Sequence, residues 1–198
     1  MIILICGFGR CGASLCMQML AAGGMPVVGE FPAFEECLQL PSGTRALESL
    51  RGHAVKLLDP HRGPIPRGPR YRAVWLDRDP KQQALSMAKF LRGVAGISFK
   101  RRDVKRIAKA FCEDRPKALA GLRGACEDVV TLRFEDILAD PLIAAVELEA
   151  LVDQELDVSA MARAVLPRDG ACRPDLGIEA MLASTTATEK TMRRGCQP

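Results

Sequence analysis

The 198-residue sequence contains few aromatic residues and no long apolar segment. Aromatic side chains make up 5% of it, so the interleaved aromatics that often accompany nucleic-acid binding are largely missing. No run approaches the eighteen apolar residues of a membrane span, and no basic segment precedes the N-terminal apolar stretch as in a signal peptide. These absences predict a cytoplasmic protein with no membrane span and no nucleic-acid partner.

The sequence also lacks a C-x-x-C pair, although it contains eight cysteines. They are Cys6, Cys11, Cys16, Cys37, Cys112, Cys126, Cys172 and Cys196. Most of them lie in apolar segments, so we interpret them as reduced core or helix residues rather than as a disulfide or zinc framework. We therefore expect no metal site.

Basic residues are clustered, although the formal net charge is only +4. The clusters occupy residues 62–72 and 100–109 and the pair Arg193-Arg194. Such clusters favour a small anionic ligand over a nucleic-acid footprint. The length and the 48% hydrophobic content suit one compact domain with a sizeable core.

The first twenty-odd residues carry the clearest pattern, which is a strand, a glycine loop and a helix. A short apolar run over residues 1–6 leads into a loop that contains Gly7, Gly9 and Gly12. These glycines allow a tight turn and a close approach of the backbone to a ligand. Loop N–H groups and the helix dipole then favour an oxyanion, and Arg10 adds a full positive charge there.

The loop departs from the nucleotide-binding pattern G-x-x-x-x-G-K-S/T at one decisive position. Gly7, Gly12 and Ser14 fit the pattern, but Ala13 stands where the phosphate-binding lysine is required. An ordinary ATPase or GTPase is therefore disfavoured. A tight strand-to-helix connection with no ligand is the alternative interpretation of this stretch.

Strands and helices alternate through the rest of the chain. Strands are predicted over 26–29, 54–58, 71–76 and 129–134. Helices are predicted over 81–91, 103–122 and 141–152, with further helical segments over 34–40 and 41–50. Residues 63–70 are predicted to form a loop, and residues 93–100 a flexible stretch. This alternation predicts a three-layer α/β/α fold with a central, mainly parallel sheet and ligands at the carboxyl ends of its strands.

Arg78 and Ser86 form a second candidate site. Arg78 follows the strand predicted at 71–76, and Ser86 lies in the second turn of the next helix, so both can reach one phosphate. A guanidinium fork and a hydroxyl together satisfy three phosphate oxygens. The alternative is that Arg78 pairs with Asp77 or Asp79 and that Ser86 only faces its own helix.

Four stretches resemble, in the right order, the PAPS-dependent sulfotransferases, which use 3′-phosphoadenosine 5′-phosphosulfate (PAPS) as sulfuryl donor. Residues 8–15 resemble the 5′-phosphosulfate loop P-K/R-S-G-T-S/T, and residues 76–86 resemble the R-N/D-P segment with its downstream serine. Residues 130–141 are similar to the structural segment R/Y-Y/F-E-D-L-x-x-D-P, and residues 192–195 resemble the R-K-G loop. The resemblance implies one sulfotransferase-like domain over 1–198 with a P-loop NTPase-like fold.

The resemblance also implies two groups of cofactor-binding residues. Gly9, Arg10, Cys11, Gly12, Ala13 and Ser14 would hold the 5′-phosphosulfate. Arg78, Ser86, Arg193, Arg194 and Gly195 would hold the 3′-phosphate of PAPS or of PAP, the desulfated cofactor. Cys11 and Ala13 depart from the family pattern, because they replace hydroxylated residues and leave Ser14 as the only side-chain donor of the loop.

The candidate catalytic residues are Glu30, Arg10, Lys56 and His61. The lysine-x-histidine of the animal cytosolic enzymes is absent, because Leu58 stands where the histidine would fall after Lys56. Many bacterial relatives resemble a pattern with a glutamate soon after the first helix, so Glu30 is the preferred base and His61 the reserve. A solvated loop carboxylate is the alternative for Glu30.

The mechanism that the resemblance implies is in-line sulfuryl transfer to a hydroxyl or amine of a small molecule or carbohydrate. Glu30 would take the acceptor proton, while Arg10, Lys56 and the loop N–H groups neutralise charge on the bridging and sulfuryl oxygens. Two alternatives stay open: a P-loop small-molecule or nucleotide kinase, which Ala13 disfavours, and a degenerate, non-catalytic nucleotide-binding protein. The sequence leaves the oligomeric state open.

Overall fold

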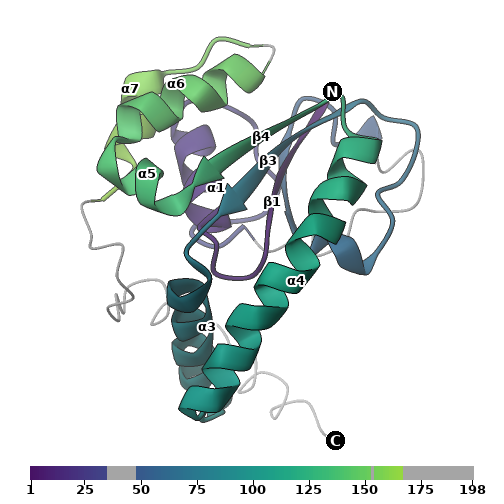
Figure 1. Cartoon of the computed structure of the whole chain (residues 1–198). Coiled ribbons are helices and arrows are strands. Elements are labelled where there is room, and N and C mark those ends of the chain that lie inside the picture. The colour runs from purple at the N-terminus through teal and green to yellow at the C-terminus, as the bar shows by residue number, and fades with distance from the viewer. Residues whose placement is uncertain (35–47, 153, 167–198) are drawn as a thin grey trace, which may run out of the picture.

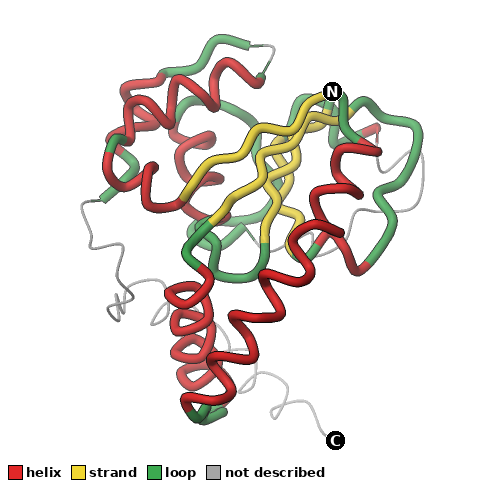
Figure 2. The backbone as a smooth tube through the Cα atoms, in the orientation of Figure 1, coloured by secondary structure: helices red, strands yellow, loops and turns green. Residues whose placement is uncertain are grey.

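A four-stranded parallel sheet organises the residues that the computed structural model describes, namely 1–34, 48–152 and 154–166. The strands are β1 (Ile2–Gly7), β2 (Ala54–Leu58), β3 (Tyr71–Asp77) and β4 (Asp128–Arg133). Their spatial order is β2-β1-β3-β4, and all three neighbouring pairs are parallel (Figure 2). The carboxyl ends of all four strands therefore share one edge of the sheet.

Helices cover both faces of this sheet. They are α1 (Ala13–Ala22), η1 (Pro60–Arg62), α3 (Pro80–Ala95), α4 (Arg101–Ala125), α5 (Phe134–Ala139), α6 (Pro141–Leu151) and α7 (Val158–Arg163). Helices α1, α5, α6 and α7 lie on one face, and the upper part of α4 lies on the other (Figure 1). This arrangement confirms the predicted α/β fold with a central parallel sheet between two helical layers.

The apolar run of β1 is explained by burial on both faces. Ile3 and Ile5 pack into the core beneath α1, whereas Ile2, Leu4 and Cys6 pack into the core beneath α4. A central parallel strand has no solvent face, so it carries apolar residues without alternation. Each sheet face thus has its own hydrophobic cluster, and β1 contributes to both.

The strand predicted over 26–29 is wrong. Only Val27 forms a bridge there, to Ala54 of β2, and the segment is otherwise irregular. Pro26 has no N–H to donate to a ladder, and Gly29 turns the chain at a φ of 94°. Glu30 consequently lies in a loop and not at a strand end.

Helices α3 and α4 are longer than predicted. Helix α3 continues to Ala95, where Gly96 ends it in the left-handed conformation, so the stretch expected to be flexible begins inside a helix. Helix α4 begins at Arg101 because the Asp103 carboxylate accepts a hydrogen bond from the Lys100 N–H at 3.0 Å. The helical segments predicted over 34–40 and 41–50 fall almost entirely outside the described residues.

The pair α3 and α4 projects beyond the carboxyl edge of the sheet (Figure 1). The two helices pack against each other along this projection, and the five residues from 96 to 100 connect them at its far end. Across the described ranges, no helix combines the length and the apolar character that a membrane crossing requires.

Candidate functional site

The loop between β1 and α1 takes a conformation that exposes backbone amides. Arg10 has a φ of 68° and Gly12 a φ of 106°, and the Cys11 N–H turns back to the Phe8 carbonyl at 3.1 Å. No described side chain caps the N-terminus of α1, so the amides of its first turn are available to an anion.

Two loop glycines are required by close packing. A Cβ on Gly7 would lie 2.5 Å from the Cys11 Sγ, and a Cβ on Gly12 would lie 2.5 Å from the Phe134 ring. Phe134 is the first residue of α5, which follows β4, so the start of α5 packs against the loop. The loop is thus held in shape by residues from distant parts of the sequence.

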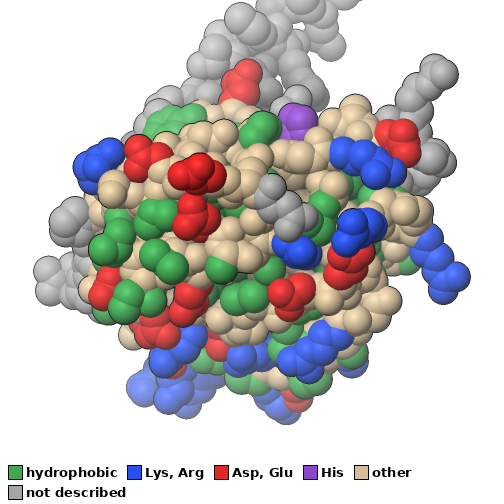
Figure 3. Space-filling view, turned by 90° about the horizontal axis from the view of Figure 1, so that it is seen from above, with side chains coloured by type: hydrophobic (Ala, Val, Ile, Leu, Met, Phe, Trp, Pro, Cys, Tyr) green, Lys and Arg blue, Asp and Glu red, His purple; other side chains and the backbone are tan. Residues whose placement is uncertain are grey.

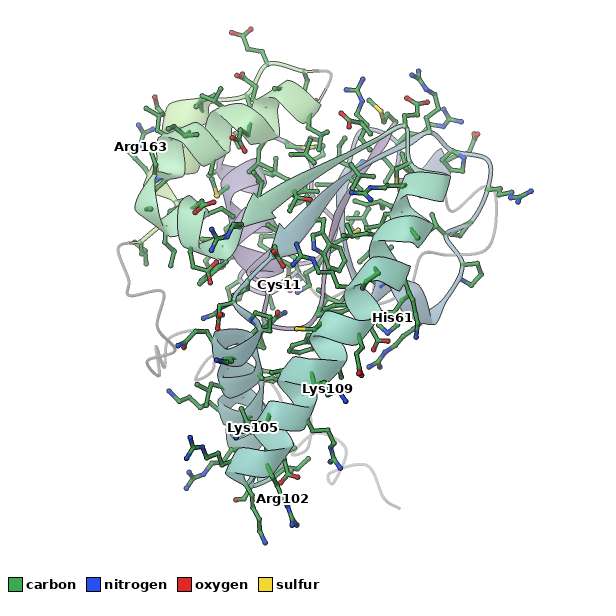
Figure 4. All side chains as sticks on the ribbon, in the orientation of Figure 1. Cys11, His61, Arg102, Lys105, Lys109 and Arg163 are labelled. Atoms are coloured by element: carbon green, nitrogen blue, oxygen red, sulfur yellow. The ribbon has the colours of Figure 1, made fainter. Side chains whose placement is uncertain are left out.

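Cys11 and Ala13 turn their side chains into the protein interior. Both are buried, and Figure 4 places Cys11 inside the molecule at the carboxyl edge of the sheet. Burial raises the pKa of the Cys11 thiol to about 11. A ligand at the loop can therefore meet these two residues only through their backbone, which leaves Ser14 as the hydroxyl of the loop.

Arg10 leaves the loop toward α3. Its Nε donates to the Ser86 Oγ at 3.2 Å, and its guanidinium lies 5.0 Å from the centroid of the Phe90 ring. Ser86 itself is buried. The structure therefore brings together Arg10 and Ser86, which the sequence assigned to two different phosphate groups.

Arg78 joins this cluster from the end of β3. It is only 8% exposed, its Nη1 donates to the Arg10 carbonyl at 3.0 Å, and its guanidinium stacks 4.3 Å from the Phe134 ring centroid. The two acidic neighbours have other partners: Asp77 pairs with Arg115 at 2.7 Å, and Asp79 caps α3. Arg78 is thus fixed against the glycine loop, while both acidic neighbours contact other groups.

Gln83 is a site residue that sequence reasoning missed. It is buried, and its Nε2 donates to the carbonyls of Phe8 and Gly9 at 3.1 and 3.0 Å. Gln83 and Ser86 are three residues apart on α3 and therefore share one face of the helix. This polar pair, placed just after a proline-initiated helix start, is the signal that could have identified Gln83.

Lys56 brings a positive charge to the other end of the loop. It lies on β2 in register with Ile5 of β1, is 3% exposed, and donates from Nζ to the Ser14 Oγ at 3.2 Å and to the Ala33 carbonyl. Ala13 occupies the position of the usual P-loop lysine. A neighbouring strand therefore places a second cation beside the loop, at Ser14, although the P-loop lysine itself is missing.

Three solved structures share this arrangement of sheet and helices. A mouse sulfotransferase complexed with PAP matches with a TM-score of 0.60 at 12% identity, over 83% of this chain and 64% of that one. This chain has the sulfotransferase fold. A retinol dehydratase with androsterone and inactive cofactor PAP matches with a TM-score of 0.53 at 16% identity, over 83% of this chain and 63% of its own.

The third of these structures with the sulfotransferase fold is a retinol dehydratase with retinol and PAP. It matches with a TM-score of 0.51 at 13% identity, over 97% of this chain and 79% of the other. This chain thus matches less than two thirds of the length of the first two structures. No protein-family model and no curated protein matches the sequence.

Within this sulfotransferase fold, Glu30 lies in an exposed loop above α1. The residues that follow it are held through their backbone: the Gln18 Nε2 donates to the Pro32 carbonyl at 2.9 Å, and Ser14 donates to the Ala33 carbonyl at 3.2 Å. The Ala33 carbonyl also accepts from Lys56. Glu30 is therefore three positions before Ala33, the residue whose carbonyl Lys56 contacts, in the sequence.

His61 lies on the other side of the sheet, beside α4 (Figure 4). Its ring packs edge-on against Phe8 at 5.4 Å, and its Nε2 lies 3.7 Å from the Asp114 carboxylate of α4. Lys56 and Ser14 belong instead to the α1 side. The structure thus separates the two candidate bases, with His61 on the α4 side and Glu30 in the loop that leads to Ala33, while Arg193, Arg194 and Gly195 lie outside the described residues.

Proposed function

We propose that this protein is a PAPS-dependent sulfotransferase. The observation that carries the proposal is the convergence of Arg10, Arg78 and Ser86 beside the glycine loop. The same fold occurs in the three structures with PAP described above. Arg78 contacts the backbone of Arg10, and the Arg10 side chain contacts Ser86. Guanidinium groups and a hydroxyl are the donors expected to recognise a phosphate.

In this proposal, Arg78 and Ser86 hold the 3′-phosphate together with Arg10. Arg78 needs little reorganisation, because stacking on Phe134 and a bond to the Arg10 carbonyl already fix its guanidinium. Gln83 holds the loop carbonyls close to α3, so the two halves of the nucleotide site keep their spacing. Arg193, Arg194 and Gly195 stay predicted additions to this 3′-phosphate site.

The 5′-phosphosulfate would lie at the N-terminus of α1. The backbone amides of Gly9, Gly12 and Ala13 would donate to it, with the Ser14 hydroxyl and the Lys56 ammonium. Lys56 also donates to the Ala33 carbonyl. A sulfuryl group would compete with that carbonyl for the ammonium.

The chemistry requires one proton transfer and stabilisation of one leaving group. PAPS supplies an activated sulfuryl group: the acceptor oxygen forms a bond to sulfur as the bond from sulfur to the 5′-phosphate oxygen breaks. Glu30 would accept the hydroxyl proton, and Lys56 would stabilise the charge that develops on the bridging oxygen. Holding both reactants in line supplies much of the remaining acceleration.

A small-molecule alcohol is the acceptor class that we propose first, ahead of amines and carbohydrates. The two retinol dehydratase structures were solved with androsterone and with retinol, which are apolar molecules. A pocket of about 500 Å³ lies beside Phe31, the residue that follows Glu30. It is lined by Gln18, Ala21, Ala22, Phe31, Arg163, Ala164 and Leu166. Its largely apolar wall suits a lipophilic alcohol.

One observation favours a second candidate, a non-catalytic PAP-binding protein. Cys11 and Ala13 carry no hydroxyl and are buried, so Ser14 is the one hydroxyl that the loop offers to the sulfuryl oxygens. Binding of the 3′-phosphate would not require those oxygens, because it depends on Arg78 and Ser86.

Transfer from radiolabelled PAPS to a panel of lipophilic alcohols, amines and sugars tests the proposal. We expect a labelled sulfate ester with at least one alcohol and release of PAP that depends on that acceptor. Tight PAP binding without transfer to any member of the panel would favour the non-catalytic candidate. Phosphate transfer from labelled ATP would instead favour the kinase.

A further inference from the structure

The far end of the α3 and α4 projection carries a concentrated positive charge. We define the basic tip as residues 92–109, which close this projection. Its exposed cations are Arg92, Lys100, Arg101, Arg102, Lys105, Arg106 and Lys109. Asp103 is the only acidic residue of the basic tip, which therefore has a formal net charge of +6.

This charge is segregated from the rest of the molecule. The whole chain has a formal net charge of +4, so the residues outside the basic tip carry a net charge of −2. Figure 3, which views the molecule from the end opposite the tip, shows basic and acidic side chains mixed over that face. The cations thus mark one end of the protein rather than its whole surface.

The cations of the basic tip are well exposed. The side chains of Arg102, Arg106 and Lys109 are 80%, 84% and 75% exposed. Arg102, Lys105 and Lys109 lie on the half of α4 that projects beyond the sheet (Figure 4). Asp103 lies 3.8 Å from Arg106, and this one carboxylate offsets little of the seven positive charges.

Apolar side chains accompany these cations at the very end of the projection. Val94 is 38% exposed and Ile97 is 47% exposed, on either side of the glycine that ends α3. Exposed bases of a nucleic acid would stack on aromatic rings, but Phe99 is half-buried and Phe90 lies under Arg10. Aliphatic residues among cations instead suit the interfacial region of a lipid bilayer.

We propose that the basic tip docks this protein on an anionic membrane surface. The cations would face lipid headgroups, and Val94 and Ile97 would enter the interface between headgroups and acyl chains. The projection extends from the carboxyl edge of the sheet, which also carries the glycine loop (Figure 1). Docking by the tip would therefore turn this edge of the sheet toward the membrane.

Sedimentation with vesicles tests this proposal on the full chain. We expect binding to phosphatidylcholine vesicles that contain about 30% phosphatidylserine, and weaker binding as salt is raised, because the attraction is electrostatic. The variant with Arg102→Gln, Lys105→Gln and Lys109→Gln together should bind about 100-fold more weakly, since each cation near the surface contributes about fivefold. Ile97→Ser should weaken binding about tenfold and should leave the salt dependence unchanged.

A matched control removes three exposed cations elsewhere, by Arg67→Gln, Lys117→Gln and Arg123→Gln. This control should bind vesicles as the unmodified chain does, and circular dichroism should show that all variants keep their helices. The proposal is overturned if the chain binds neutral vesicles equally well, binds neither kind, or loses as much affinity in the control. Binding of an oligonucleotide through Arg102, Lys105 and Lys109 without vesicle binding would identify a nucleic-acid surface and would also overturn it.

Discussion

The two ends of the glycine loop are built very differently. On the α3 side, Arg78, Gln83 and Ser86 are all buried, and each one contacts the loop between β1 and α1. On the α1 side, Glu30 is exposed and Phe31 is 69% exposed, and the segment is held through backbone carbonyls.

This difference separates two tasks. A preorganised cluster of buried donors suits a constant group such as a nucleotide phosphate, because the donors cost no reorganisation on binding. An exposed loop on a rigid scaffold suits a variable acceptor, because its side chains can change without disturbing the core. We therefore expect changes on the α3 side to alter affinity and changes at Glu30 to alter turnover alone.

The largest effect is expected for Glu30→Gln. Glutamine keeps the shape of the side chain but cannot accept the acceptor proton, so turnover should fall about 10²–10⁴-fold. Steady-state transfer from PAPS measures the loss, and PAP affinity should be unchanged. The parallel variant His61→Ala should retain most of the turnover. Loss of transfer in His61→Ala with normal turnover in Glu30→Gln would move the base to the α4 side.

The next effect concerns the 3′-phosphate and Arg78→Ala. Loss of a charged hydrogen-bonding partner costs about 1.5–3 kcal/mol, so the affinity for PAP should fall about 10–150-fold. The affinity for adenosine 5′-phosphosulfate, which lacks the 3′-phosphate, should change much less. Calorimetric titration measures both, and Arg115→Ala, at an arginine that pairs with Asp77, is the control. An equal loss for both ligands would assign Arg78 to the fold.

Gly12→Ala should reduce stability through the contact with Phe134. Its φ of 106° and the position of the new Cβ, 2.5 Å from the ring, together predict a loss of about 1–3 kcal/mol in the free energy of unfolding. Gly24→Ala is a matched control, because Gly24 also has a positive φ, of 92°, but no atom within 4 Å of the added Cβ. Denaturant unfolding of both variants should show the larger loss for Gly12→Ala, and equal losses would contradict the packing argument.

A smaller effect is expected on alkaline titration. Burial raises the pKa of Cys11 from 9.0 to about 11, so the unfolded chain loses this proton at lower pH than the folded protein. The Cys11 thiol makes its full contribution to the free energy of unfolding below pH 9. As the pH rises to 11, about 2 kcal/mol of this contribution should be lost. Unfolding curves of the unmodified chain and of Cys11→Ala should therefore converge over this range. Parallel curves would show that the thiol is not protected.

Local patterns predicted most of the fold. The apolar run before Gly7 gave β1, and the proline after Asp79 gave the start of α3. The strand predicted at 26–29 failed, because a β-branched pair cannot form a ladder between a proline and a glycine in the left-handed region. Strand pairing depends on free N–H groups and on the direction of the backbone, and an apolar pattern predicts neither.

The site was predicted in part, for a similar reason. Sequence spacing predicted that Arg78 and Ser86 share a site, which stays a prediction, and it did not show that Arg10 contacts both residues or that Gln83 bonds to the loop. Nor did it show that Phe134 packs on both Gly12 and Arg78. These contacts join residues about fifty to one hundred and twenty positions apart, and only the packing of the sheet and helices determines them.

Thermal unfolding with PAP, in the absence of magnesium, tests the central claim most directly. If Arg10, Arg78, Ser86 and the loop amides bind PAP, the ligand at about a hundred times its dissociation constant should stabilise the folded state by about 2.7 kcal/mol. For a chain of this size, that corresponds to a rise of about 5–11 °C in the unfolding temperature. An unfolding temperature that PAP leaves unchanged, with an equal or larger rise from magnesium and ATP, would contradict the sulfotransferase proposal.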